Sequence, residues 1–249
     1  MKIVTYNLRC VYRGDGVNSF VHRAGLILDT LQEETPDIIC FQEATEKNIG
    51  FLRRYLSPAY TVLLTQREKD LSGEGLAVAY RPDKISLYGL DVFWLSPTPN
   101  EIASKFPGQS IHARICQNLL FKNEGSGSLF RLYNLHLEEI REDVRVQQME
   151  LVLQRKASET VPTLLLGDLN TSPDGNVIPL CKARGLVDLT ADIPSSFHGF
   201  GKRDPYIKLD YILTDAATAA LVQDVTPWEH CVNGIYLSDH YPIALNIDL

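Results

Sequence analysis

Two stretches of this chain repeat one pattern: an apolar segment, an amphipathic helix, and a second apolar segment that ends in an acidic residue. The first stretch runs from VTYNL to Glu43 in IICFQE, and the second runs from RLYNL to Asp168 in TLLLGD, at nearly equal spacing. A helix between two apolar strands is the usual connection of parallel strands. The repeat therefore predicts two strand–helix–strand units, each with a carboxylate at the carboxyl end of a strand, where α/β folds bind ligands.

Periodicity along the rest of the chain also favours an α/β fold. Residues 18–34 and 139–156 carry apolar side chains every three or four positions, which predicts two amphipathic helices, and a shorter helix is expected over 174–183. Apolar runs predict strands at 2–6, 37–41, 61–64, 76–80, 112–121, 129–135, 163–166, 209–213 and 242–247. No long Ser/Gly-rich linker interrupts the chain, so we expect a single domain over residues 1–249.

Charge and cysteine content restrict the class of protein. The 24 basic and 31 acidic residues give a net charge of −7, which argues against broad binding to duplex DNA. The five cysteines are odd in number, widely spaced and without a CxxC pair, as expected for reduced thiols. The N-terminal MKIVTYNLRC turns polar too early for a signal peptide, and no apolar run approaches the roughly 20 residues of a membrane span. We expect a cytoplasmic monomer with no membrane contact.

Polar residues directly follow apolar strands at several positions. The set is Asn7, Glu43, His136, Asp168, Asn170, Asp210, Asp239 and His240. Carboxylate and amide oxygens suit Mg²⁺ or Mn²⁺, whereas zinc prefers thiolates or closely spaced histidines, and no HExxH is present. The chain also lacks GxSxG, the P-loop motif and GxGxxG, so a serine nucleophile or nucleotide loop has no support. Each residue alone is compatible with a turn, cap or strand-end role; only the set indicates a site.

Six motifs in one order identify a family resemblance. TYNL, FQEA, YNLHLE, LLLGDLNTSPDG, LDYIL and SDHYPI resemble the motifs of the endonuclease/exonuclease/phosphatase superfamily, the DNase I-like metal-dependent phosphoesterases. NSFVHR, FWLSPTP and FHGFG further resemble a bacterial branch that is similar to nocturnin-like deadenylases. The resemblance implies a four-layer α/β sandwich of two packed mixed sheets flanked by helices, with one half of the repeat in each sheet.

The resemblance also implies a metal site and a reaction. Glu43 would be the main ligand of Mg²⁺ or Mn²⁺, Asp239 would assist it, and Asn7 would bind metal or phosphate. The implied activity is hydrolysis of a phosphoester by metal-assisted attack of water, as a phosphodiesterase, nuclease or phosphatase. The alternative is a catalytically inactive relative that acts as a binding scaffold.

The remaining motif residues take catalytic roles in the same resemblance. Asp168 would orient or deprotonate the attacking water, and Asn170 would contact the phosphate. His240 would stabilise the pentacovalent phosphorane, held by Asp210 in a carboxylate–imidazole pair. His136 would bind phosphate or assist the leaving group.

Two loops are candidates for a substrate rim. FHGFG brings Phe197, His198 and Phe200 close to basic residues, a composition suited to stacking a base and steering phosphate. The Pro- and Ser-rich loop 94–110 carries Lys105. Both loops are equally compatible with ordinary surface connections. Because neither a duplex-binding surface nor a membrane-inserting hairpin is evident, the expected substrate is a small phosphorylated molecule or a single-stranded nucleic-acid end.

Overall fold

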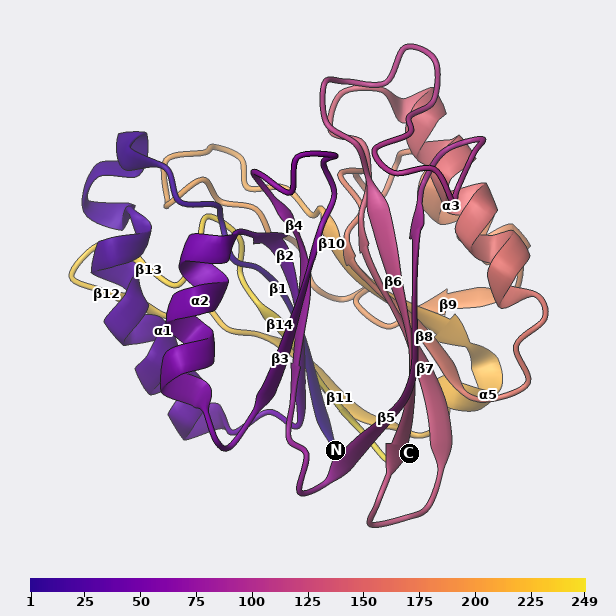
Figure 1. The fold of residues 1–249 in the computed structure, drawn as a ribbon, viewed down its shortest axis with the longest axis horizontal. Helices are drawn as coiled ribbons and strands as arrows, with labels where there is room; N and C mark the ends of the chain where they lie inside the picture. Colours follow the sequence, from indigo (N-terminus) through magenta and orange to yellow (C-terminus); the bar gives the residue numbers. More distant parts are fainter.

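The structure, a computed structural model, describes residues 1–249 as two six-stranded mixed sheets packed face to face (Figure 1). The first sheet has the order β11-β14-β1-β2-β4-β3 and contains β1 (Lys2–Asn7), β2 (Ile38–Ala44), β3 (Thr61–Gln66), β4 (Gly75–Tyr80), β11 (Val222–Pro227) and β14 (Ile243–Ile247). The second has the order β5-β6-β7-β8-β10-β9 and contains β5 (Ile85–Trp94), β6 (Ile115–Asn123), β7 (Leu129–His136), β8 (Thr163–Asp168), β9 (Leu186–Asp188) and β10 (Asp210–Asp215).

Helices cover the outer face of each sheet, which completes the four-layer α/β sandwich expected from the sequence (Figure 1). The first sheet is covered by α1 (Phe20–Glu34) and α2 (Glu46–Leu56), and the second by α3 (Glu142–Lys156), α4 (Val177–Ala183) and α5 (Ala216–Ala219). A 3₁₀ helix (Arg13–Asn18) precedes α1, and β12 (Cys231–Val232) pairs with β13 (Ile235–Tyr236) in a small separate hairpin. None of the helices combines the length and apolar character that crossing a bilayer requires.

Both halves of the sequence repeat form as predicted. β1 and β2 pair in parallel and are connected by α1, and β7 and β8 pair in parallel and are connected by α3. The register places Asn7 beside Gln42 and His136 beside Asp168, so each unit ends in polar residues. These strand ends lie at the edge of the sandwich opposite the two chain termini (Figure 1).

Alternation along the strands explains the packing of the core. In β1, Ile3 lies in the apolar cluster between the sheets, whereas Val4 and Tyr6 lie in the cluster that includes side chains of α1 and α2. In β8, Leu164 faces the other sheet and Leu165 packs with α3. Strands covered on both faces read as continuous apolar runs. A charged residue directly after such a run is therefore placed at the edge of the core.

The sequence periodicity missed α2, β5, β9, α5 and β11 as well as the short β12–β13 hairpin. α2 begins with a capping box in which Asn48 takes the place of the more usual Glu or Gln and accepts a hydrogen bond from the Thr45 N–H (2.7 Å). β5 lies at the edge of its sheet and exposes residues such as Tyr88, so it lacks a continuous apolar run. The strand predicted at 112–121 begins only at Ile115, because residues 112–114 belong to the preceding loop.

We expect replacement of Gly167 by alanine to destabilise the fold. Gly167 has a φ of 141°, and an added Cβ would lie 2.0 Å from the carbonyl oxygen of Leu135 in the neighbouring strand. Relieving this clash requires the two central strands to move apart, at an expected cost of about 2 kcal/mol or more in the free energy of unfolding. Urea denaturation measures this loss. The control is Gly50→Ala in α2, where an added Cβ meets no atom; equal stability of the two variants would contradict the prediction.

Candidate active site

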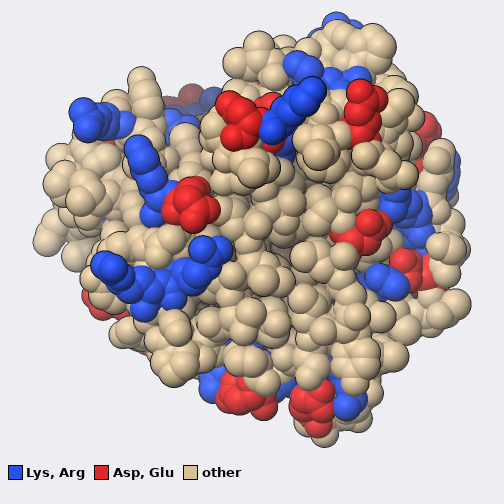
Figure 2. Space-filling view, in the orientation of Figure 1, with Lys and Arg blue, Asp and Glu red and all other residues tan.

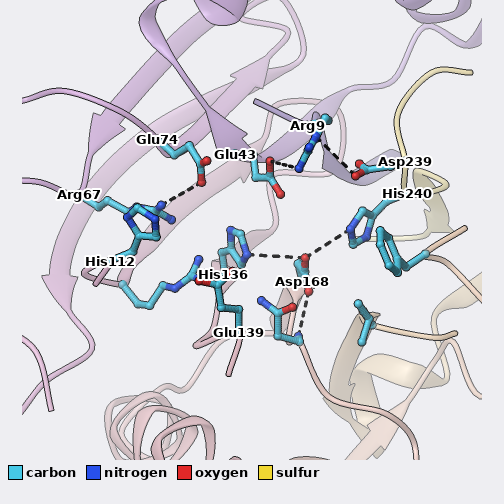
Figure 3. A pocket seen from close by; sticks show the side chains of 14 residues that line it. Arg9, Glu43, Arg67, Glu74, His112, His136, Glu139, Asp168, Asp239 and His240 are labelled. Atoms are coloured by element: carbon cyan, nitrogen blue, oxygen red, sulfur yellow. Dashed lines mark hydrogen bonds and ion pairs between the residues drawn. The ribbon is translucent and has the colours of Figure 1, made fainter. Parts of the chain in front are cut away.

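A pocket of about 250 Å³ opens where β2, β7 and β8 end, between the two sheets (Figure 3). It is lined by Arg9, Glu43, Arg67, Glu74, His112, Arg114, His136, Glu139, Asp168, Asn170, Phe197, Leu209, Asp239 and His240. Six of the eight strand-end residues singled out in the sequence thus line one pocket. The other two, Asn7 and Asp210, lie behind its wall and bond to residues that line it.

Asn7 connects the two halves of the repeat. Its Nδ2 group donates to Glu43 Oε1 (3.2 Å) in its own sheet and to Asp168 Oδ2 (2.9 Å) in the other sheet. Its Oδ1 atom accepts the backbone N–H of Arg9 (3.0 Å), which fixes the orientation of the amide. Asn7 therefore presents a donor to the two carboxylates, while its oxygen accepts one backbone N–H; its expected role as a ligand of metal or phosphate remains a prediction.

Unusual backbone conformations aim three side chains at this pocket. Glu43 has a φ of 51° at an irregularity in the pairing of β2 with β4, Arg9 has a φ of 57°, and Asn170 has a φ of 50°. Non-glycine residues rarely adopt positive φ, and such conformations cluster at functional sites. At these three positions the backbone departs from a regular strand conformation, and this departure directs the side chains into the pocket.

Two carboxylates surround a positive charge at one side of the pocket. The Arg9 guanidinium lies 4.0 Å from Glu43 Oε2 and 3.6 Å from Asp239 Oδ2, and it also pairs with Asp15 (3.1 Å) (Figure 3). Burial raises the pKa of Glu43, but the Cys10 N–H, the Arg9 charge and other neighbours outweigh it and lower the pKa overall. Glu43 is therefore ionised, and with Asp239 it forms an oxygen-rich location for a cation.

Asp168 lies at the centre of the polar contacts in Figure 3. Its Oδ1 accepts the backbone N–H of Asn170 (2.9 Å), and its Oδ2 lies 3.7 Å from His136 Nε2 and 3.8 Å from His240 Nε2. Burial and the charge of Asp210 raise the pKa of Asp168 to about 7 in the metal-free protein. A carboxylate with a pKa near neutrality is suited to accept a proton from water.

Asp210 and His240 form a buried carboxylate–imidazole pair. Asp210 is the partner of Asp168 in the β8–β10 register, and its Oδ2 lies 2.7 Å from His240 Nδ1. The same oxygen accepts the hydroxyl of Ser196 (2.6 Å). This arrangement holds the ring so that its Nε2 faces Asp168. Ligand atoms of Asp168, Asp210 and His240 lie within 4.8 Å of one another. Asp210 already has two hydrogen-bond partners, Ser196 and His240. We therefore assign Asp210 to orienting His240 and do not assign it to binding a cation.

His136 and Asn170 complete the wall between the sheets. Burial and the charges of Arg114 and Arg67 hold the pKa of His136 well below its usual value, so this imidazole is neutral. Asn170 donates from Nδ2 to the carbonyl of Leu137 (3.1 Å), which leaves its second amide hydrogen available to a ligand.

Only one of the four residues expected at the substrate rim lines the pocket. Phe197 does so and packs against the ring of His240, with centroids 4.7 Å apart. His198 is instead fully buried, stacked on Tyr241, and accepts the N–H of Gly201. Phe200 turns toward the buried Arg23, and the Lys105 ammonium donates to backbone carbonyls of its own loop.

The sequence analysis missed six charged or polar residues of the pocket: Arg9, Arg67, Glu74, His112, Arg114 and Glu139. Most come from loops and turns, where the sequence carries no periodic signal. One signal was present, because the strand predicted at 112–121 starts with the basic segment His112-Ala-Arg114 before its apolar run. A charged residue just before a buried strand is therefore as useful for predicting a pocket residue as one just after a strand.

We expect the imidazole of His240 to remain protonated above pH 8 in EDTA-treated protein. Burial alone lowers its pKa, but the carboxylates of Asp210, Asp168 and Asp239 outweigh burial and raise the pKa to about 10. Since the folded-state value lies above the unfolded value of about 6.5, the ion pair contributes fully to stability below pH 6.5 and its contribution is lost as the pH rises toward 10. NMR titration of the ring protons checks this, and a midpoint at or below pH 7 would contradict it.

Comparisons with known proteins agree with this fold. The model of the Endonuclease/Exonuclease/phosphatase family matches residues 4–240. The endonuclease/exonuclease/phosphatase from Bacteroides vulgatus is 24% identical, with a TM-score of 0.91 over 100% of this chain and 98% of that one. The mannosyl-6-phosphatase from Bacteroides thetaiotaomicron is 23% identical (TM-score 0.87, 100% of both chains), and the human nocturnin catalytic domain is 18% identical (TM-score 0.76, 98% and 93%).

Proposed function

Because the chain belongs to the endonuclease/exonuclease/phosphatase family of phosphoester-hydrolysing enzymes, we propose that this pocket hydrolyses a phosphoester by attack of activated water, assisted by Mg²⁺ or Mn²⁺. The observation that carries the proposal is the double contact of Asn7, which joins Glu43 of one sheet to Asp168 of the other. A phosphate at this junction would have a cation on one side and a water-activating carboxylate on the other. That is the charge distribution that phosphoester hydrolysis needs.

The donor set fits a hard divalent cation. Glu43 and Asp239 supply carboxylate oxygens, and the cationic group of Arg9 between them marks where positive charge is favourable. We propose that these two carboxylates hold the ion, with Asn7 orienting Glu43. When bound, the cation would supply charge neutralisation at a non-bridging phosphate oxygen.

The protein's own groups account for the remaining chemistry. Asp168 accepts a proton from the water whose oxygen forms the new bond to phosphorus, while the ester P–O bond breaks and the departing oxygen takes up a proton from solvent. The charged His240, held by Asp210, donates from Nε2 to an oxygen of the phosphorane. Asn170 and His136 lie where they can contact the phosphate or the leaving group.

The size and charge of the pocket favour a small substrate or a chain end. A volume of about 250 Å³ is at the lower limit of pockets for small molecules. On the face shown in Figure 2, basic and acidic side chains are interspersed, without a continuous basic stripe for a duplex backbone. We therefore propose a small phosphorylated molecule or a single-stranded nucleic-acid end. The location of the protein in the cytoplasm and its monomeric state remain predictions.

The competing hypothesis is an inactive relative that binds a partner. Against it, the residues with assigned chemistry all lie in or directly behind one pocket, and the His240–Asp210 contact is formed at 2.7 Å. Turnover of several classes of phosphoester with added Mn²⁺ distinguishes the two: hydrolysis above background that a chelator stops supports the enzyme, and no hydrolysis of any class supports the scaffold.

Replacement of Glu43 by glutamine is expected to weaken Mn²⁺ binding by at least about tenfold. The change keeps the shape of the side chain but removes the ionised carboxylate that faces Asp239 across the Arg9 guanidinium. Isothermal titration calorimetry measures the affinity. Glu46→Gln, three residues along the chain and exposed, is the matched control and should bind Mn²⁺ as the unmodified protein does. Unchanged binding by Glu43→Gln would remove Glu43 from the metal site.

A further inference from the structure

Arg114 is a buried cation without a partner. Four basic side chains of the chain are buried, and three of them, Arg23, Arg67 and Lys208, bond to carboxylate or carbonyl oxygens. Arg114 is 2% exposed, its side chain makes neither a hydrogen bond nor an ion pair, and its Nε and Nη1 atoms are shielded from solvent without an acceptor. Burying a charge is strongly unfavourable unless an opposite charge and hydrogen bonds compensate it.

The surroundings of Arg114 do not neutralise it. Burial and the nearby charge of Arg67 lower the pKa of Arg114 and outweigh the opposite effect of Glu139, Glu138 and Asp168, none of which forms an ion pair with it. A second cavity of about 10 Å³, lined by Arg67, Arg114 and His136 among others, has room for about one water molecule. Water can satisfy a donor but cannot neutralise a guanidinium. An anion in direct contact with the guanidinium can therefore come only from the main pocket, which Arg114 also lines.

The position of this charge in the pocket is specific. In Figure 3, Arg67 and His112 lie on the side of the pocket away from Asp239 and His240, with His136 between them. Arg67 is held there by Glu74 at 2.9 Å. Arg114 lies near both Arg67 and His136, since its charge acts on the imidazole of His136 and is itself affected by Arg67. The pocket thus has a cation side, formed by Glu43 and Asp239 around Arg9, and an opposite side on which Arg67 is paired with Glu74 and Arg114 alone is free to bind an anion.

Resting on the proposed function, we infer that Arg114 binds a third non-bridging oxygen of the substrate phosphate, so that the preferred substrates are phosphomonoesters. A monoester carries three non-bridging oxygens and up to two negative charges, whereas a diester carries two such oxygens and one charge. The cation side and the His240–Asn170 side each serve one oxygen. Arg114 serves the third, which a diester replaces by an uncharged ester oxygen, leaving the guanidinium buried and unneutralised. Charge-assisted hydrogen bonds to phosphate are stronger than neutral ones, so the loss of this contact with a diester makes the site select monoesters over diesters.

Binding of inorganic phosphate to EDTA-treated protein tests the subsite without catalysis. Calorimetry should show that Arg114→Gln weakens phosphate binding by roughly tenfold or more, while Arg114→Lys, which keeps the charge, loses less. The matched control is Arg141→Gln, an exposed arginine paired with Asp143 outside the pocket, which should bind phosphate normally. If Arg114→Gln binds phosphate as tightly as the control and melts at the same temperature, the subsite does not exist. If it fails to fold, Arg114→Met, which also removes the charge but fills the buried space with an apolar side chain, is measured in its place with the same two outcomes.

Kinetics then test the selectivity. With Mn²⁺, the unmodified protein should show a higher kcat/KM for 4-nitrophenyl phosphate than for bis(4-nitrophenyl) phosphate. Arg114→Gln should lower kcat/KM for the monoester at least about tenfold more than for the diester. Equal losses for both esters, or a preference of the unmodified protein for the diester, would overturn the assignment. If neither ester is hydrolysed by the unmodified protein, the proposed function fails, and the phosphate-binding measurement still decides the subsite separately.

Discussion

Replacement of Asp168 by asparagine is expected to lower kcat by about 10³-fold or more while leaving the fold intact. The amide keeps the shape of the side chain and its oxygen can still accept the Asn170 N–H at 2.9 Å. It cannot accept a proton from water, and a positioned general base contributes typically 10²–10⁴-fold to a rate. The loss of charge also removes the attraction between this carboxylate and the protonated His240 3.8 Å away.

Rates at saturating substrate and Mn²⁺ provide the measurement, with thermal melting as a check on folding. Asp174→Asn, an exposed aspartate in the same motif, is the matched control and should retain full activity. A residual rate of Asp168→Asn within about tenfold of the unmodified protein would mean that another group activates the water.

The second large effect is expected at the His240–Asp210 pair. His240→Ala should lower kcat by about 10²-fold or more, because it removes the charged donor to the phosphorane. Asp210→Asn should cost at least tenfold, because the 2.7 Å contact that fixes the imidazole and favours its protonated form is weakened. Neither variant is expected to change Mn²⁺ affinity much, since neither side chain belongs to the proposed metal ligands.

A double-mutant cycle tests whether the two residues act as one unit. The variant with both substitutions should be little slower than the worse single variant, because an asparagine at 210 has no imidazole left to orient. Defects that multiply would show that Asp210 and His240 act independently, and the pairing would then have no catalytic meaning.

The architecture could be predicted from the sequence because each strand–helix–strand unit is formed by consecutive residues and because the large core requires long apolar strands. The positions of Glu43 and Asp168 at strand ends follow from an apolar run that stops at a charge, and the parallel pairing of their strands follows from the helix between them. Both features depend on consecutive residues, and tertiary packing preserves them. The edge strand β5 and the helix α2 were missed because neither carries a strong local pattern.

The three arginines of the pocket could not be predicted in the same way. Arg67 follows β3, Arg114 ends a long loop and Arg9 follows β1, and only the course of the chain in space brings them to one pocket. The rim residues failed for a related reason. FHGFG was predicted to be either a substrate rim or an ordinary surface loop, but its backbone bonds to Asp239, which places His198 in an aromatic cluster and leaves only Phe197 at the pocket.

The family relationship and the geometry of the pocket together make metal-dependent phosphoester hydrolysis the central claim. The most direct measurement is the release of 4-nitrophenol from 4-nitrophenyl phosphate and bis(4-nitrophenyl) phosphate by EDTA-treated protein, before and after addition of Mn²⁺ or Mg²⁺, with Asp168→Asn measured alongside. The account predicts no turnover without metal, turnover with metal, reversal by excess chelator, and loss of that turnover in Asp168→Asn. Turnover that persists in EDTA, or that Asp168→Asn retains in full, would contradict it.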